Sequence, residues 1–261
     1  MAESQTSPST YAAYWLFKLD PAYLRLTDAE QAAGKQEFVR ALDVRSERVQ
    51  LRSAYSTVGF RHDVDFMLWM LATDLDDLQT LATSLRRTGL GKYLTVVETY
   101  IGVVTGARYD PAHQPAFMLG VAPKKFISVY PFVNTSEWYQ LSYERRRALM
   151  AEHGEIGRKY AVPREKLVPA GTVAAGGTAT AVATQAEPAT AEVGGGVLAN
   201  TVDSFGLGDY EFILANESDD ASEIVRMMES LRRSEVRIYT KLDTPIYLGR
   251  AGSPEEVLAT L

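Results

Sequence analysis

Cysteine is absent from the chain, and histidine is scarce. The absence of cysteine excludes disulfides, a cysteine nucleophile, a thiolate-ligated haem and iron–sulfur clusters held by cysteine. Only three histidines occur among 261 residues: His62, His113 and His153. A three-histidine zinc site would require all of them to converge, whereas a haem iron requires one imidazole.

The chain also lacks long apolar runs and an excess of basic residues. No stretch approaches the roughly 18 apolar residues of a membrane span. The first ten residues contain no basic segment followed by an apolar core, so they do not resemble a signal peptide. The formal net charge of -6 argues against a nucleic-acid binder. We therefore expect a cytoplasmic protein without a membrane span or a nucleic-acid partner.

The first half of the chain shows the pattern of a ferredoxin-like unit. Hydrophobic residues make up 46% of the chain, which is enough for a core. The patterns predict, in chain order, a strand, a helix, two strands, a helix and a strand, over 11–19, 28–48, 51–58, 65–73, 74–88 and 94–104. This β-α-β-β-α-β order is typical of a ferredoxin-like module. We expect the unit to span 10–104, after a disordered tail over 1–9.

The same order recurs after a connecting loop over 105–124. The predicted elements are a strand, a helix, two strands, a helix, a strand and a short terminal helix, over 125–133, 142–160, 197–205, 210–216, 223–233, 236–248 and from Pro254. The fold class is therefore α+β, with a second ferredoxin-like unit over 125–261 and both sheets joined into one barrel-like core. Residues 163–196 contain no aromatic side chain, and we expect them to form a mobile insertion.

The stretch 125–160 carries the residues of greatest chemical interest. A strand runs into Tyr130, a polar turn contains Trp138, and the following helix places His153 on the same face as Leu149. One histidine thus points where an apolar residue would normally lie. Its spacing alone allows two interpretations, a core histidine bonded to a carbonyl or a metal ligand.

The blocks YPFV, EWY and HG in this stretch, with VLANTV and FGLGDYEF further on, resemble the chlorite dismutase-like family. The likeness is closest to its coproheme decarboxylase branch of the actinobacterial type. It agrees in the order and spacing of separate blocks and extends over most of the chain. The resemblance implies that iron-coproporphyrin III (coproheme) is oxidatively decarboxylated to haem b with hydrogen peroxide, in haem biosynthesis. It also implies a homo-oligomer, usually a pentameric ring.

The resemblance implies a role for each candidate site residue. His153 would be the proximal iron ligand, and Glu217 would accept a hydrogen bond from its second nitrogen. Tyr130 would form a radical that takes a hydrogen atom from a propionate, and carbon dioxide would then leave. Trp138 would line the second propionate, and His113 would act as a base toward peroxide. The competing interpretations are core packing for Tyr130 and Trp138, and ordinary surface positions for Glu217 and His113.

Other positions bear on the choice between branches. Asn134 follows YPFV, where these decarboxylases usually carry Lys or Arg as a propionate partner; Arg232 is either such a partner or a solvated helix-end residue. Ala199 stands at the distal position where chlorite dismutases have an arginine, which argues against chlorite dismutation. Glu217 and the C-terminal PIYLGRAGSPEEVLATL still favour chlorite dismutase as an alternative. A non-enzymatic haem carrier or sensor is a third hypothesis, and His62 is predicted to lie on the surface.

Overall fold

The computed structural model describes residues 9–43, 47–104, 114–163, 166–167, 169 and 195–261. The predicted tail except residue 9, much of the connecting loop and most of the predicted insertion lie outside the described residues. The elements are β1 (Tyr11–Leu19), η1 (Pro21–Arg25), α1 (Asp28–Asp43), β2 (Val49–Ser56), β3 (Phe66–Ala72), α2 (Leu75–Arg86), η2 (Gly91–Tyr93), β4 (Leu94–Val103), η3 (Ala116–Leu119), β5 (Phe126–Asn134), α3 (Ser136–Gln140), α4 (Tyr143–Arg158), β6 (Leu198–Asp203), β7 (Phe212–Ser218), α5 (Ala221–Leu231), η5 (Glu235–Tyr239), β8 (Thr240–Leu242), β9 (Tyr247–Gly252) and α6 (Pro254–Leu258).

The strands form one antiparallel sheet that closes on itself. Their order is β7-β6-β4-β1-β3-β2-β9-β5-β8, and β7 also pairs with β5. The strands from β7 to β5 therefore close into a barrel, and β8 extends from β5 outside the ring. Strands β1 to β4 belong to the amino-terminal ferredoxin-like half, and strands β5 to β9 belong to the carboxy-terminal half. This arrangement confirms the predicted fold class of two tandem units joined in an α+β barrel.

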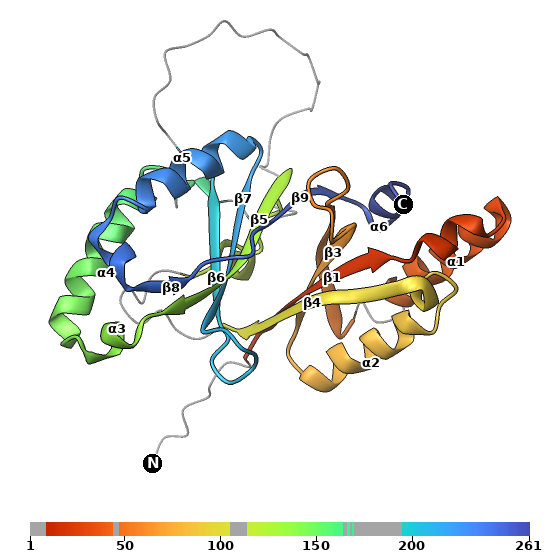
Figure 1. The fold of residues 1–261 in the computed structure, drawn as a ribbon, viewed down its shortest axis with the longest axis horizontal. Coiled ribbons are helices and arrows are strands. Elements are labelled where there is room, and N and C mark those ends of the chain that lie inside the picture. Colours follow the sequence, from red (N-terminus) through yellow and green to blue (C-terminus); the bar gives the residue numbers. More distant parts are fainter. Residues whose placement is uncertain (1–8, 44–46, 105–113, 164–165, 168, 170–194) are drawn as a thin grey trace, which may run out of the picture.

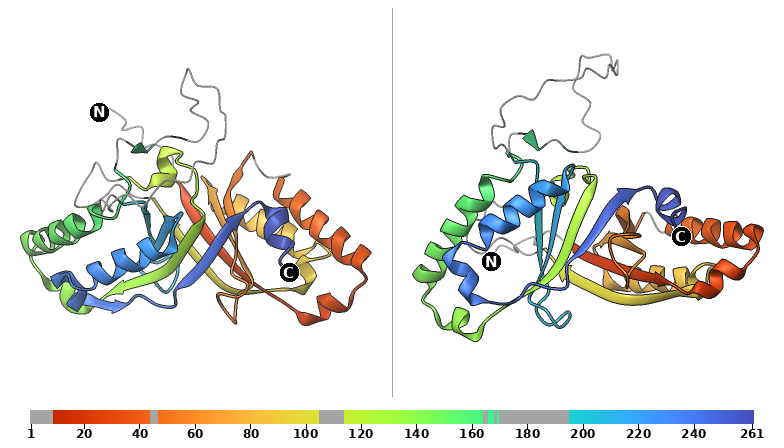
Figure 2. Two further views of the ribbon diagram at one scale, coloured as in Figure 1. Left: turned by 90° about the horizontal axis from the view of Figure 1, so that it is seen from above. Right: turned by 45° about the horizontal axis from the view of Figure 1, so that its top comes forward.

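Helices flank the barrel on two opposite sides (Figures 1 and 2). The amino-terminal half is covered by α1, α2 and α6, whose apolar side chains pack on the outer face of its strands. The carboxy-terminal half is covered by α4 and α5, with a smaller cluster of Val197, Ile224 and Met227. A third cluster, which includes Tyr14, Trp69 and Ile127, fills the barrel interior. Because side chains alternate along a strand, one side chain points into the barrel interior and the next points outward toward a helical layer.

One predicted element is wrong. The segment 236–248 was expected to be a continuous strand, but it consists of η5, the short strand β8 and the first residues of β9. Pro245 lies between β8 and β9 and has no N–H to donate to a ladder. The high β propensity of the flanking residues therefore does not produce a continuous strand. No helix among the described residues is long and apolar enough to cross a membrane.

Candidate functional site

Tyr130 lies on the outer face of the carboxy-terminal half of the barrel. Strand β5 pairs with β7, and this register places Ser128 opposite Asn216. Ser128 and Tyr130 are two residues apart on β5, so both lie on the same face of the sheet. The Tyr130 side chain is buried beneath α5, with 4% of the residue exposed. Its hydroxyl donates to Met228 Sδ at 3.4 Å and accepts from Asn216 Nδ2 at 3.4 Å. The phenol is thus held between the sheet and a helix.

The surroundings of Tyr130 keep its phenol neutral. Burial raises the pKa of Tyr130 to about 12, and Asp243 acts in the same direction, while Asn216 and Arg232 favour the charged form. Arg232 is itself paired with Asp243 at 2.9 Å. Arg232 therefore has a carboxylate partner within the protein, and its contact with a propionate stays a prediction. Tyr130 keeps its O–H at neutral pH and can give up a hydrogen atom or donate a hydrogen bond.

His153 belongs to α4, which begins after a cap by Ser142. Leu149, one turn earlier on the same face, is buried, and His153 is partly buried. Burial lowers the pKa of His153, although Glu152 acts in the opposite direction, so the imidazole is neutral at neutral pH and has a free lone pair. Its Nδ1 is buried without a hydrogen-bond partner among the described residues. An orphaned buried nitrogen is unusual and fits a ring that turns toward a ligand.

The structure brings several predicted site residues to one side of the carboxy-terminal half. Helix α5 packs on β5 and β7, and α4 packs on α5 and η5; Figure 1 shows both helices on the same side of these strands. Trp138 in α3 is buried, and its ring lies 5.8 Å from that of Tyr239 in η5. Tyr130, Trp138, Arg232 and His153 therefore belong to elements that border one helical layer. The Trp138 contact fits packing and does not test a role with a propionate.

Ala199 lies on the same face of the sheet as Tyr130. It is paired with Asn216 across the β6–β7 ladder, and Asn216 bonds to the Tyr130 hydroxyl. The next residue, Asn200, is buried and turns the other way, toward Phe117 and Glu217. The predicted distal position thus presents a methyl group to this face and carries no charge.

Glu217 is fully buried inside the barrel. Its carboxylate accepts hydrogen bonds from Arg52 at 2.6 Å, Tyr55 at 3.2 Å and Asn200 at 3.1 Å. Both partners of the ion pair are almost inaccessible, with side-chain exposures of 5% for Arg52 and 0% for Glu217. Burial raises the pKa of Glu217, while Arg52 and the hydrogen bonds favour its charged form.

This position corrects both interpretations of Glu217. Neighbouring residues in a strand point to opposite faces, so Glu217 faces the interior because Asn216 faces the helices. The structure does not pair Glu217 with His153, and Glu217 is not a surface residue either. The acceptor expected for the imidazole is therefore absent from the contacts of the described residues.

The remaining candidates have simpler positions. The backbone N–H and the side-chain amide of Asn134 both bond to Glu211, at 2.8 and 3.0 Å, and the amide also lies 3.4 Å from Tyr139 Oη. Asn134 thus uses its backbone and side-chain donors to hold the end of β5 to Glu211. His113 lies outside the described residues. His62 is exposed, which confirms its prediction as a surface residue.

The chlorite dismutase family model matches residues 30–178 and 189–252. The chain belongs to the chlorite dismutase family. A relative from Mycolicibacterium smegmatis, named coproheme decarboxylase, is 31% identical over 260 residues, which cover 99% of this chain and 97% of that protein. A coproheme decarboxylase from Staphylococcus carnosus is 28% identical over 178 residues, or 60% of this chain and 71% of that protein.

Solved structures of this family share the fold. A mutant chlorite dismutase from Candidatus Nitrospira defluvii superposes with a TM-score of 0.78 at 19% identity, over 97% of this chain and 95% of that one. The imidazole complex of the chlorite dismutase from the same organism gives a TM-score of 0.75 at 19% identity, over 96% and 94% of the two chains. At this identity the likeness supports the fold alone.

Asn216 and Met228 contact the Tyr130 hydroxyl and were not among the predicted site residues. The alternation of side chains along β7 (FILANES) places Asn216 and Glu217 on opposite faces of the sheet. It does not show which of the two residues faces the helices. The orphaned nitrogen of Arg146 in α4 was also missed. Its signal was present, because Arg146 precedes Leu149 and His153 on one helical face.

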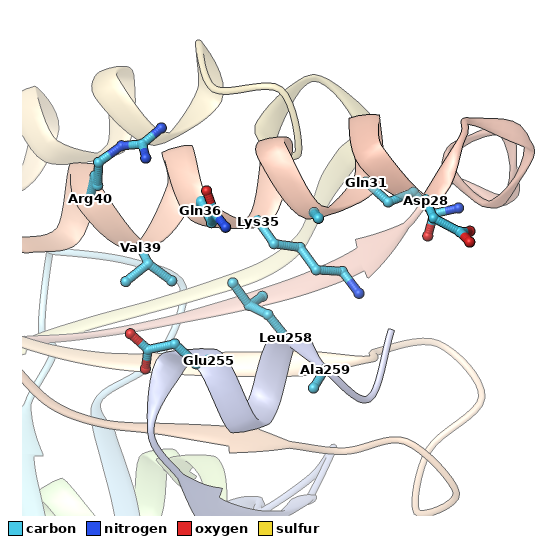
Figure 3. Close-up of a pocket in the computed structure, with 10 residues that line it drawn as sticks. Asp28, Gln31, Lys35, Gln36, Val39, Arg40, Glu255, Leu258 and Ala259 are labelled. Carbon is cyan, nitrogen blue, oxygen red and sulfur yellow. The ribbon is translucent and has the colours of Figure 1, made fainter.

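A separate cleft of about 570 Å³ opens between α1 and α6 (Figure 3). It lies on the amino-terminal half, across the barrel from the candidate site (Figure 1). It is lined by Asp28, Gln31, Ala32, Lys35, Gln36, Val39, Arg40, Glu255, Leu258 and Ala259. None of the predicted site residues lies there, so this cleft is distinct from the candidate site.

Proposed function

We propose that this protein decarboxylates coproheme to haem b with hydrogen peroxide. The observation that carries the proposal is the buried, neutral phenol of Tyr130, which faces the helical layer to which His153 belongs. A relative that matches almost the whole chain and is named coproheme decarboxylase supports the same activity. The cytoplasmic location expected from the sequence and the homopentamer implied by the resemblance stay predictions.

The residues fit an iron porphyrin substrate. The neutral imidazole of His153 would hold the iron, and the propionates would lie toward Tyr130 and Trp138, with Arg232 at the edge. The bound iron porphyrin supplies the redox chemistry with peroxide. His113 stays the predicted base that accepts a proton from peroxide and returns it to the leaving oxygen.

The reaction balances with one peroxide for each propionate. Each reacting propionate loses one hydrogen atom from the carbon next to the porphyrin ring and then one electron. Its carboxylate leaves as carbon dioxide, and a vinyl group remains on the ring. The two electrons, the proton of the lost hydrogen atom and one further proton from solvent reduce one hydrogen peroxide to two waters. Tyr130 would lose the hydrogen atom of its O–H to the iron porphyrin after peroxide has oxidised it, and would regain a hydrogen atom from the propionate. Two such rounds convert coproheme to haem b.

The activity of the unaltered protein is the direct test. When iron-coproporphyrin III and hydrogen peroxide are added, mass spectrometry is expected to show the loss of one and then two carboxyl groups, ending at haem b. Chlorite should release little oxygen because Ala199 offers no cation to an oxochlorine anion. Oxygen release from chlorite without decarboxylation would favour chlorite dismutase. Bound but unreacted coproheme would favour a haem carrier or sensor.

Ligation by His153 is tested separately from turnover. His153→Ala is expected to remove the absorption spectrum of histidine-ligated five-coordinate iron and to weaken coproheme binding by at least about tenfold, on the scale of metal-site substitutions. His62→Ala is the matched control, since His62 is exposed and should leave the spectrum unchanged. An unaltered spectrum in the His153 variant would show that another group holds the iron.

A further inference from the structure

Arg146 shares a helical face with the proposed iron ligand. Arg146, Leu149 and His153 follow one another at three- and four-residue spacing in α4, so their side chains project from the same side. Arg146 is partly buried, whereas Arg145 and Arg147 are exposed. The Arg146 side chain therefore points into the layer between α4 and the elements that it packs against.

The guanidinium of Arg146 has no partner in the described part of the chain. Its Nε is buried without a hydrogen bond, as is Nδ1 of His153, and no described residue forms an ion pair with it. The other orphaned atoms among the described residues belong to Tyr14, Arg52, Trp69 and Tyr100, which lie in or against the interior cluster of the barrel. The guanidinium is half-buried and its Nε has no partner, so an anion that reached it would meet no competing carboxylate among the described residues.

Three neighbouring arginines have ion-pair partners. Arg145 is paired with Glu235 of η5. Arg232 and Arg237 both pair with Asp243, at 2.9 and 3.4 Å. Arg147 and Arg158 of α4 also have no ion pair with the described residues, but both are exposed, so Arg146 is the unpaired arginine of α4 that is half-buried.

The position of Arg146 along α4 indicates which anion it meets. The first turns of α4 lie beside η5, as the pair of Arg145 with Glu235 shows, and Trp138 also packs on η5 through Tyr239. His153 lies seven residues further along α4, or about 10 Å along the helix axis. A porphyrin whose iron sits at His153 carries its carboxylates at the rim of the ring, away from the iron. Arg146 lies on the side of His153 that meets η5 and Trp138, the side to which the proposed function assigns the propionates.

We propose that Arg146 binds a propionate carboxylate of the substrate from helix α4. The inference rests on the proposed function, because it takes His153 as the iron ligand. Nε and one Nη of a guanidinium form an edge that holds a carboxylate through two parallel charge-assisted hydrogen bonds. Arg146 is a binding residue in this proposal and takes no part in bond breaking.

Binding without peroxide tests the proposal. Arg146→Leu is expected to raise the Kd for iron-coproporphyrin III by about ten- to a hundredfold, the range for loss of a hydrogen bond between charged groups. The tetramethyl ester of iron-coproporphyrin III, which has no carboxylate, should bind parent and variant equally. The spectrum of histidine-ligated iron should persist in the variant. Without ligand, the variant should be about as stable as the parent, because the half-buried Arg146 side chain makes no ion pair with the described residues.

Two further variants sharpen the result. Arg145→Leu is the matched control on the adjacent, exposed and paired arginine, and it should leave both affinities unchanged. Arg146→Lys keeps the charge without the fork and should bind coproheme with an intermediate affinity; it also serves if the leucine variant does not fold. Equal affinity of parent and Arg146→Leu for coproheme, or an equal loss for the acid and the ester, would overturn the role of Arg146 and leave the proposed function standing. A parent that binds no coproheme would overturn both.

Discussion

Tyr130→Phe is expected to stop decarboxylation while coproheme stays bound. Burial raises the pKa of Tyr130 to about 12, so the residue carries its O–H throughout the neutral range and can lose a hydrogen atom from it. Phenylalanine keeps the ring and its packing but has no such hydrogen. Haem b formation should fall by about a hundredfold or more, as when a positioned group that exchanges protons with the substrate is removed. The measurement is the mass of the porphyrin products at fixed times after addition of peroxide.

The folding of this variant is expected to be nearly normal. Within the described part of the chain, the Tyr130 hydroxyl makes two long contacts, with Met228 and Asn216 at 3.4 Å each. Their loss should cost about 1 kcal/mol in the free energy of unfolding. Tyr160→Phe is the matched control, because Tyr160 lies beside the same helix and its hydroxyl is 2.6 Å from Ser230 Oγ. It should retain full activity, whereas a full yield of haem b from Tyr130→Phe would limit Tyr130 to packing.

Local patterns were sufficient for most of the fold. The predicted strand 11–19 coincides with β1, and the predicted stripe of α2 contains the buried residues Leu78, Leu81 and Leu85. Such elements follow from periodicity and capping, which the sequence displays directly. Around Pro245, the strand propensity of the flanking residues is outweighed by the missing N–H of proline, so β8 and β9 are separate strands.

The candidate site was predictable only in part. Helical spacing placed His153 beside Leu149, and the structure agrees that this face is turned inward. The partner of Glu217 was not predictable, because Arg52 lies 165 positions away and meets it only when the barrel closes. Which face of β7 looks toward the helices depends on the same closure. The pairing of distant strands thus determines both the partner of Glu217 and the face of β7 that looks toward the helices, and local sequence patterns do not predict either.

Arg52→Leu is expected to destabilise the protein strongly. Arg52 on β2 and Glu217 on β7 join the two halves through the barrel interior, with Nη2 and Oε2 2.6 Å apart. Removing the cation leaves a fully buried carboxylate whose remaining donors among the described residues are Tyr55, Asn200 and the backbone N–H of Lys124. Breaking a buried ion pair in this way costs about 3–5 kcal/mol in the free energy of unfolding. Thermal unfolding at one protein concentration measures the loss as a lower Tm.

The pH dependence shows whether the stranded carboxylate is the cause. Without Arg52, the pKa of Glu217 in the folded state should rise further above the ordinary value of 4.5. The folded state then binds a proton more tightly than the unfolded state, so the stability of the variant should fall as pH rises from that ordinary value through the raised folded pKa. The deficit relative to the parent should therefore be smaller in mild acid than at neutral pH.

A second substitution and a surface pair serve as controls. Glu217→Gln, added to Arg52→Leu, removes the buried charge while its amide oxygen can still accept from Tyr55 and Asn200, so it should recover much of the lost stability and abolish the pH dependence. Arg145→Leu breaks a pair whose side chains are 45% and 49% exposed, and it should cost less than about 1 kcal/mol. If Arg52→Leu costs no more than Arg145→Leu, the pair does not stabilise the contact between the two halves. If the double variant recovers nothing, the stranded charge of Glu217 is not the cause of the loss. Recovery with loss of the pH dependence would instead trace the instability to the buried charge of Glu217.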